Sequence, residues 1–381
     1  MKSCHVMVKP TGATCNLACD YCFYLEKAQL YPERKTRTMN DETLTRFISQ
    51  HIAAQETDEV IFAWQGGEPT LAGLAFFQRA VALQKKLSQD KTILNTFQTN
   101  GLLLNDDWCR FFHQHNFLIG ISIDGDAILH DAFRKTVSGK PTHQRVVEAV
   151  DLLKKYKVQF NTLTVVNALN SQYPIRVYEF LKNLGSHHMQ FIPLLETTAE
   201  GVNERSVTPS SFGVFLKTIF YHWIRRDIGV IEIPFFEHTF AAWCGLPPLT
   251  CVFSPTCGNA FALEQNGDLY QCDHFVNSAH LLGNIQHSTI GEMLDSDASR
   301  LFGQNKQPAA PECLHCNVKF ACHGGCPKDR ISLSSRGIAE LNYFCSSYQT
   351  FFRYTEPYML MMKSLLDEGY SPSDIRHTLC E

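Results

Sequence analysis

The chain has 381 residues, of which 44 % are hydrophobic and 19 % are charged, a composition typical of a globular protein with two or three domains. Its formal net charge of -4 gives no electrostatic attraction to nucleic acid or to a membrane surface, so we expect neither as a partner. No apolar run approaches the length of a membrane span, and residues 1–10 lack the continuous apolar stretch of a signal peptide. These features predict a cytoplasmic protein.

Residues 5–196 alternate between short apolar stretches and segments with helical periodicity. The apolar stretches are rich in β-branched and aromatic residues and predict strands at 5–9, 59–64, 93–98, 118–123, 158–166 and 188–195. Helices are predicted between them near 41–55, 73–88, 106–115, 142–156 and 173–184, the first and third with caps at Asn40 and Asn105. Six strand–helix units predict an α/β fold with a parallel sheet, two units short of a complete eightfold barrel.

The remainder of the chain has a different pattern. Residues 208–240 predict one helix followed by a short extended piece, and a helix rich in aromatic residues and Met is predicted at about 347–367. The segment 250–350 has eight cysteines and little periodicity, so we expect its fold to depend on bound metal. The predicted parts are a partial barrel over 1–200, a connecting helical segment over 201–249, a cysteine-rich domain over 250–350 and a C-terminal helix over 351–381.

The chain has 15 cysteines, an unusual number for a protein of this size without an export signal. In a reducing compartment, groups of closely spaced cysteines indicate metal or iron–sulfur ligation and not disulfides. Four cysteines stand alone in the sequence, and we expect them to pack as structural thiols. They are Cys4, Cys109, Cys244 and Cys380.

The first group of cysteines, Cys15, Cys19 and Cys22, directly follows the first predicted strand. A 4Fe-4S cube has four irons to ligate, so three thiolates leave one iron open. An open iron can chelate the amino and carboxylate groups of S-adenosylmethionine (SAM). The position fits this chemistry, because the loops after barrel strands carry active sites. A zinc loop without its fourth ligand, or a chance spacing, is the alternative.

Eight more cysteines follow residue 250, and four of them stand in the block ECLHCNVKFACHGGCP. This C-x2-C-x5-C-x3-C spacing is highly specific for metal, and eight thiolates are sufficient for two four-cysteine sites. Spacing alone leaves open which cysteine joins which site and whether the metal is iron or zinc. The eight are Cys251, Cys257, Cys272, Cys313, Cys316, Cys322, Cys326 and Cys345.

The first motif resembles the signature of the radical SAM superfamily, in which an aromatic residue, here Tyr21, precedes the last cysteine. Residues 65–69, Gln-Gly-Gly-Glu-Pro, follow the second predicted strand and resemble the GGEP motif of that family, which binds the SAM amino group. Taken alone, this run is also a common turn sequence. The SAM contacts that the resemblance implies are Tyr21, Gly66, Gly67, Glu68, Ser122, Arg134 and Leu195.

The cysteine-rich segment resembles the SPASM extension, and the chain as a whole resembles the anaerobic sulfatase-maturating enzymes. The similarity includes CNLACDYCFY, WQGGEPTLAGL, QTNG, ISIDG, LGNI and ELNYFC. It implies a partial (β/α)6 barrel of radical SAM type with a C-terminal SPASM domain, and three 4Fe-4S clusters in all. One auxiliary cluster is then expected on Cys251, Cys257, Cys272 and Cys326, and the other on Cys313, Cys316, Cys322 and Cys345.

The same resemblance implies the reaction. A 5′-deoxyadenosyl radical formed from SAM removes a hydrogen atom from Cβ of a Cys or Ser in a sulfatase, and loss of a proton and an electron leads to Cα-formylglycine. Asp273, beside the implied ligand Cys272, is the implied general base. His274 is a rival base, and a carboxylate that caps a turn is the structural alternative for Asp273. The implied substrate contacts are Tyr24, Gln65 and Asn100.

The implied partners are a sulfatase polypeptide and a reduced flavodoxin- or ferredoxin-type electron donor, and we expect a monomer. Two other functions stay open from the sequence. The first is a SPASM enzyme that forms thioether or carbon–carbon crosslinks in a precursor peptide. The second is a non-catalytic iron–sulfur electron carrier or a zinc-stapled adaptor, which would have no use for the GGEP loop or the three-cysteine motif.

Overall fold

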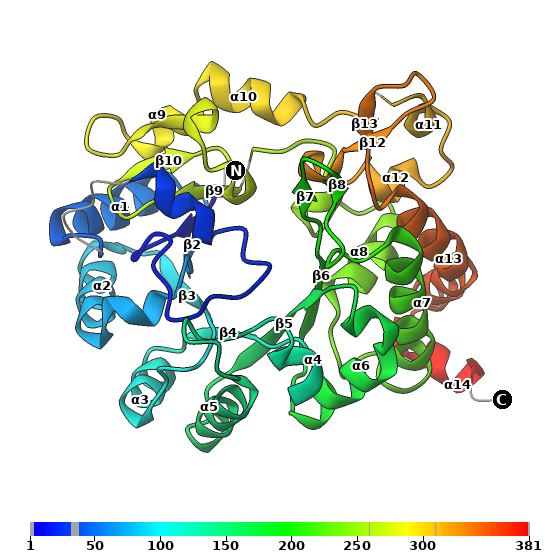
Figure 1. Ribbon diagram of the computed structural model, residues 1–381, viewed down its shortest axis with the longest axis horizontal. Coiled ribbons are helices and arrows are strands. Elements are labelled where there is room, and N and C mark those ends of the chain that lie inside the picture. The colour runs from blue at the N-terminus through cyan, green and yellow to red at the C-terminus, as the bar shows by residue number, and fades with distance from the viewer. Residues whose placement is uncertain (1–3, 32–37, 259, 309, 380–381) are drawn as a thin grey trace. The chain divides into compact units, whose positions relative to one another are not determined.

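The computed structural model describes residues 4–31, 38–258, 260–308 and 310–379 (Figure 1). The chain forms two compact units, which are described separately. The first unit is drawn from residues 1–122, 131–160 and 257–305, and the second from 123–130, 161–256 and 306–381. Each unit therefore combines segments that are far apart in the sequence.

A mostly parallel sheet forms the centre of the first unit, in the strand order β11-β10-β9-β1-β2-β3-β4. Strand β1 pairs in parallel with β2 on one side, where Met7 lies opposite Ala63, and with β9 on the other, where His5 lies opposite Ala260. The β9–β10 and β10–β11 pairs are antiparallel. The strands are β1 (His5–Val8), β2 (Glu59–Trp64), β3 (Thr92–Thr99), β4 (Leu118–Ser122), β9 (Ala260–Leu263), β10 (Asp268–Tyr270) and β11 (Leu281–Asn284).

Helices α1, α2, α3 and α5 of the first unit begin within one residue of their predicted starts, while α9 and α10 are absent from the prediction. Asn40 Oδ1 accepts a hydrogen bond from Thr43 N at 2.8 Å, and Asn105 Oδ1 accepts one from Trp108 N at 3.1 Å, so both predicted caps are present. Figure 1 shows α1, α2, α3 and α5 on one face of the sheet. The helices are α1 (Asp41–Ala53), α2 (Leu74–Leu87), α3 (Asp106–Gln114), α5 (His143–Lys155), α9 (Ile290–Leu294) and α10 (Asp297–Gln304).

Aromatic side chains fill the core between these helices and the sheet. The rings of Trp64 and Phe77 are 5.4 Å apart and meet at 89°, and those of Phe77 and Phe97 are 5.0 Å apart at 70°. Edge-to-face contacts of this kind add to the stabilisation from buried apolar area. Trp64 ends β2 and Phe97 lies in β3, so this core packs against the strands that lead into the loops after β2 and β3.

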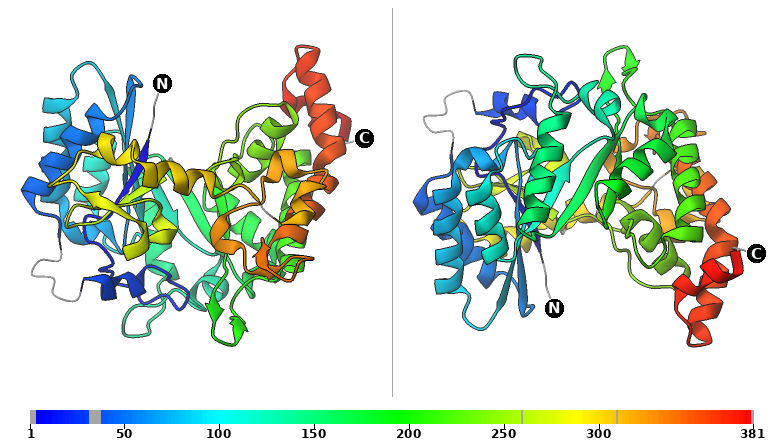
Figure 2. Two further views of the ribbon diagram at one scale, coloured as in Figure 1. Left: turned by 90° about the horizontal axis from the view of Figure 1, so that it is seen from above. Right: turned by 90° about the horizontal axis from the view of Figure 1, so that it is seen from below.

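In the second unit, strands β5 and β6 are parallel, with Thr162 opposite Met189. Helices α7 and α13 lie side by side, as Figures 1 and 2 show. The Phe351 ring of α13 lies 5.8 Å from Phe220 of α7 and 5.4 Å from Phe236 of α8. The elements are β5 (Phe160–Val166), α6 (Pro174–Asn183), β6 (Met189–Pro193), β7 (Thr197–Thr198), β8 (Gly201–Val202), α7 (Pro209–Arg226), α8 (Pro234–Trp243), α11 (Pro311–Leu314), α12 (Lys319–Cys322), β12 (Ser332–Leu333), β13 (Ala339–Leu341), α13 (Cys345–Asp367) and α14 (Ile375–Leu379), while α4 (Ala127–Asp131) crosses the unit boundary.

The α/β class is confirmed, and β1 to β6 lie within two residues of their predicted bounds. The prediction for 208–240 is wrong in its second half, because helix α8 begins at Pro234 where only an extended piece is expected. Strands β9, β10 and β11 are also absent from the prediction, and the division into four predicted parts stays a prediction. Among the described residues, no helix is both long and apolar enough to cross a membrane.

Candidate active site

The three cysteines of the first motif lie in one loop after β1. Cys22 N donates to Cys19 O at 3.1 Å, and Leu17 N donates to Cys15 Sγ at 3.4 Å. Burial raises the pKa of the Cys15 thiol to about 12, and the nearby Glu68 carboxylate and the other two thiols act in the same direction. The thiol is therefore protonated at neutral pH until a metal displaces the proton.

The loop of residues 65–69 packs directly against the cysteine loop. Glu68 N donates to Thr14 O at 2.9 Å. A Cβ atom at Gly67 would lie 2.1 Å from Thr14 O, and Gly66 has a φ of +125°, which disfavours any residue with a side chain. Glycine is therefore required at both positions, because a side chain there would prevent the two loops from approaching this closely.

Glu68 is fully buried, and donors of the chain itself hold its carboxylate. Oε1 accepts from Thr70 N at 3.0 Å, from Thr70 Oγ1 at 2.6 Å and from Thr99 Oγ1 at 2.7 Å. Oε2 accepts from Asn100 N at 2.8 Å. Burial raises the pKa of Glu68, and these hydrogen bonds oppose that shift. The carboxylate therefore ties the loop after β2 to the end of β3.

The other predicted SAM contacts are divided between the units. In the first unit the Arg134 guanidinium lies 5.5 Å from the Tyr21 ring centroid, a cation–π contact that brings these two residues together. Ser122, at the end of β4, accepts a hydrogen bond from Gln98 Nε2 at 2.9 Å. Leu195 belongs to the second unit, where it follows β6 and is half-buried.

Asp273 forms an ion pair at the start of a 3-10 helix, η5 (Asp273–Phe275). Its Oδ1 lies 2.5 Å from Nζ of Lys9, the residue that follows β1, and Lys9 is 1 % exposed. The same ammonium group lies 4.4 Å from the ring centroid of Tyr24, whose hydroxyl donates to Glu264. Lys9 and Glu264 are not predicted from the sequence, because nothing local marks a lysine or a glutamate as the partner of a residue some 240 or more positions away.

The remaining predicted base and substrate contacts lie in the segments that follow β10, β2 and β3. The His274 ring contacts the Phe23 ring, with centroids 5.4 Å apart. Gln65 is half-buried, and its backbone N donates to Val8 O at 2.9 Å. Asn100 is buried, and its Nδ2 is directed at the sulfur of Cys15. All of these residues lie in the first unit, as does Asp273.

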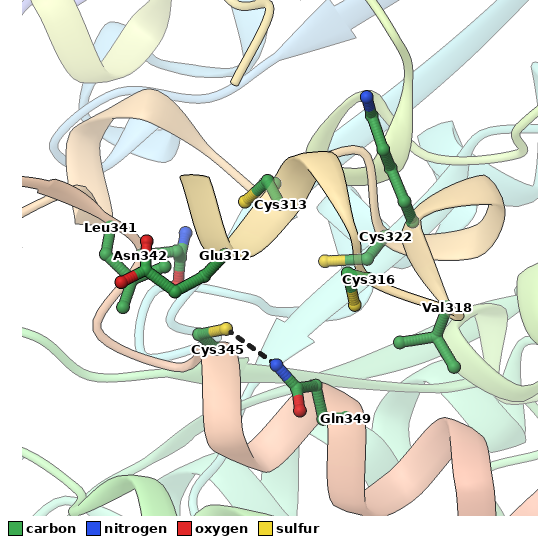
Figure 3. Close-up of a pocket in the computed structure, with 11 residues that line it drawn as sticks. Glu312, Cys313, Cys316, Val318, Cys322, Leu341, Asn342, Cys345 and Gln349 are labelled. Carbon is green, nitrogen blue, oxygen red and sulfur yellow. Dashed lines mark hydrogen bonds between the residues drawn. The ribbon is translucent and has the colours of Figure 1, made fainter. Parts of the chain in front are cut away.

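Four of the later cysteines line one pocket in the second unit (Figure 3). They come from α11, the turn after it, the end of α12 and the first turn of α13. Gln349 Nε2 donates to the sulfur of Cys345 at 3.3 Å. Burial raises the pKa of Cys322 to about 12, and the neighbouring thiols act in the same direction. The pocket is lined by Cys313, Cys316, Cys322 and Cys345, the set expected for one auxiliary cluster.

The other expected set of ligands is divided between the units. Cys257 and Cys272 belong to the first unit, and Cys251 and Cys326 belong to the second. Within the described ranges, no three His, Cys, Asp or Glu side chains are close enough to share one metal ion. Of the isolated cysteines, Cys109 is fully buried and Cys4 and Cys244 are half-buried, while Cys380 lies outside the described residues.

Two family descriptions match the chain. The radical SAM superfamily matches residues 10–181, and SPASM, an iron–sulfur cluster-binding domain, matches residues 251–317. A radical SAM domain uses a 4Fe-4S cluster and SAM, and a SPASM domain binds auxiliary iron–sulfur clusters. SAM and these clusters are therefore the cofactors of this chain, and the cysteine loop and the cysteine-lined pocket are suited to hold clusters.

The chain is similar to individual relatives over nearly its whole length. The chain is 42 % identical to the serine-type anaerobic sulfatase-maturating enzyme of Bacteroides thetaiotaomicron, over 99 % of this chain and 95 % of that protein. It is 33 % identical to the cysteine-type enzyme of Clostridium perfringens, over 93 % of this chain and 97 % of that protein. The solved structure of native anSMEcpe with bound AdoMet and Cp18Cys peptide matches with a TM-score of 0.86 at 32 % identity, over 95 % of this chain and 99 % of that one. The chain belongs to the anaerobic sulfatase-maturating enzymes of the radical SAM superfamily.

Proposed function

We propose that this protein oxidises a Cys or Ser side chain of a sulfatase to Cα-formylglycine. The observation that carries the proposal is its 42 % identity, over 99 % of the chain, to an enzyme of that type. The cysteine loop after β1, the loop of residues 65–69 that packs against it, and the cysteine-lined pocket support the proposal. When bound, SAM and the clusters supply the radical that removes hydrogen from Cβ, and they accept the electron that this carbon then loses.

The proposed ligands of the SAM-binding cluster are Cys15, Cys19 and Cys22. Because the Glu68 carboxylate already accepts four hydrogen bonds within the chain, we expect the SAM amino group to meet backbone carbonyls of Gly66 and Gly67. Two auxiliary clusters with four cysteines each complete the proposal. Their ligands are Cys251, Cys257, Cys272 and Cys326 for one, and Cys313, Cys316, Cys322 and Cys345 for the other.

Asp273 is the proposed general base. Its ion pair with Lys9 fixes the carboxylate, and a side-chain exposure of 13 % leaves it within reach of a substrate. In the proposed reaction it accepts the thiol proton of a Cys substrate, which leaves a thioaldehyde that water hydrolyses to the aldehyde and hydrogen sulfide. With a Ser substrate it accepts the hydroxyl proton, and the aldehyde forms directly. Tyr24 and Gln65 are proposed to contact the substrate.

The proposed substrate is a polypeptide, and the proposed electron donor is a reduced flavodoxin- or ferredoxin-type protein. A monomer is sufficient for this chemistry, since one chain contains all the proposed ligands. The proposal of these partners is based on the resemblance to the family and on the relatives named above.

An anaerobic peptide assay tests the proposal. The reconstituted protein is incubated with SAM, a reductant and a peptide of the Cys-x-Pro-x-Arg or Ser-x-Pro-x-Arg type, and the products are read by mass spectrometry. We expect the aldehyde, with loss of sulfur from the Cys peptide, and no aldehyde from a peptide with Ala at that position. SAM cleavage without aldehyde from either peptide contradicts the proposal. A product that keeps its sulfur in a thioether supports the crosslinking alternative instead.

A further inference from the structure

Asn100, the residue that follows β3, is held firmly in place. Its backbone N donates to Glu68 Oε2 at 2.8 Å, and its Oδ1 accepts from Leu102 N at 3.0 Å. Its Nδ2 donates to Asn16 Oδ1 at 2.8 Å. These contacts fix the plane of the amide, and Nδ2 also lies 3.8 Å from Cys15 Sγ, within reach of a hydrogen bond to sulfur. Only 7 % of the residue is exposed, so the amide is largely shielded from water.

We propose that the Asn100 amide donates a hydrogen bond to the Cys15 thiolate of the SAM-binding cluster and so raises the reduction potential of that cluster. Hydrogen bonds to ligand sulfurs are one of the properties that set such potentials, because they stabilise the additional negative charge of the reduced state. The effect is strong here because little water screens the amide dipole. The inference rests on the part of the proposed function that places a cluster on Cys15, and it is independent of the substrate.

The hydrogen-bond inventory of the amide supports this role over the substrate contact implied by the family resemblance. The two N–H groups of Nδ2 are matched by Asn16 Oδ1 and Cys15 Sγ, and Oδ1 accepts from Leu102 N. A substrate acceptor at Nδ2 would have to replace or share one of its two hydrogen bonds. Asn100 is thus a positioning residue that acts on the cluster through its ligand.

The test compares the midpoint potential of this cluster in wild type, Asn100→Ala and Asn100→Asp. EPR samples poised at a series of potentials are split and frozen with and without SAM, and the signal that SAM shifts belongs to the cluster with the open iron. Asn100→Asp keeps the acceptor for Leu102 N but replaces the donor by a negative charge. We expect reduction to be about tenfold less favourable in Asn100→Ala, a potential about 59 mV lower for a one-electron couple. The decrease in Asn100→Asp should be larger.

Asn105→Ala is the matched control, because Asn105 is another hydrogen-bonded asparagine and caps the neighbouring helix α3. Its potential should equal that of wild type. The inference is overturned if both Asn100 variants bind the full amount of iron and have the midpoint potential of wild type. If Asn100→Ala binds less iron, the isosteric Asn100→Asp decides, and a wild-type midpoint potential in that variant overturns the inference. A failure of the underlying cluster assignment is seen separately, because Cys15→Ala would then retain the SAM-sensitive signal.

Discussion

At the scale of single residues, the pair formed by Lys9 and Asp273 determines where the proposed base can act. Lys9 is among the largest fully buried side chains of the described chain, and its ammonium contacts both a carboxylate and the Tyr24 ring. A buried ammonium group requires such partners, because removing it from water is costly. The carboxylate is thereby held next to Tyr24, a proposed substrate contact.

Replacing Asp273 by Asn should separate SAM cleavage from product formation. The variant lacks the acceptor for the substrate proton, so formylglycine formation should fall by about 10²- to 10⁴-fold, the usual contribution of a general base. SAM cleavage should continue, since none of the proposed SAM contacts is changed. Chromatography of 5′-deoxyadenosine and mass spectrometry of the peptide measure the two products together.

Asp268→Asn is the control for this prediction, because it makes the same substitution on β10, five positions earlier, at a carboxylate that accepts from Tyr31 and Asn284. It should form aldehyde at close to the wild-type rate. Wild-type aldehyde yields from Asp273→Asn would remove Asp273 from the role of base and direct attention to His274.

At the scale of elements, helix α13 connects the cysteine-lined pocket to the aromatic core of the second unit. Its first residue, Cys345, is one of the four that line the pocket, and Phe351 and Phe352 are fully buried in the next turns. Cys345→Ala should therefore remove one cluster, lowering the iron content from about twelve to about eight atoms per chain. Iron and sulfide analysis of the anaerobically reconstituted protein measures this.

Cys244→Ala provides the comparison, since this half-buried thiol at the end of α8 is not among the pocket residues. Its iron content should remain at about twelve atoms per chain. An unchanged iron content in Cys345→Ala would show that Cys345 is not a ligand.

Elements with strong local signals could be predicted from the sequence. Helices α1 and α3 have an asparagine cap and an apolar stripe, and both begin where predicted. Helix α8 lacks such a stripe, because its sequence PFFEHTFAAW is apolar on nearly every side and packs against α13. Strands β9, β10 and β11 have three or four residues each, too few to show a period, and they are stabilised by pairing with one another and with distant β1.

The candidate site likewise has a part that could be predicted from the sequence and a part that could not. Cysteine spacing and the GGEP run identify the cysteine loop and the loop after β2, because both are contiguous motifs. The pairing of Lys9 with Asp273, and the direction of the Asn100 amide toward Cys15, depend on tertiary packing that no local pattern encodes.

At the scale of the whole molecule, the later cysteines should couple metal content to stability. Helices α11 and α12 have only four residues each, and burial raises the pKa of the Cys322 thiol, at the end of α12, to about 12. Thiols that bind iron contribute to folding only when iron is present. Iron removal by a chelator should therefore lower the melting temperature and open residues 306–345 to protease before the α1–α3 segment.

Limited proteolysis with mass spectrometry of the fragments tests this order of cleavage. Protein with its iron restored is the control and should regain the original protection. The same first cleavage sites with and without iron would contradict a structural contribution of the clusters to this region.

The position of β1 also affects how the chain is made. Strand β1 lies between β2 and β9, and roughly 200 residues separate the end of β2 from the start of β9. At a synthesis rate of about 5–20 residues per second, the β9 side of β1 stays unpaired on the ribosome for about 10–40 seconds after β2 has emerged. An unpaired strand edge invites pairing with other chains. The nascent protein thus has a period of exposure to aggregation that ends only when the segment from residue 257 onward arrives.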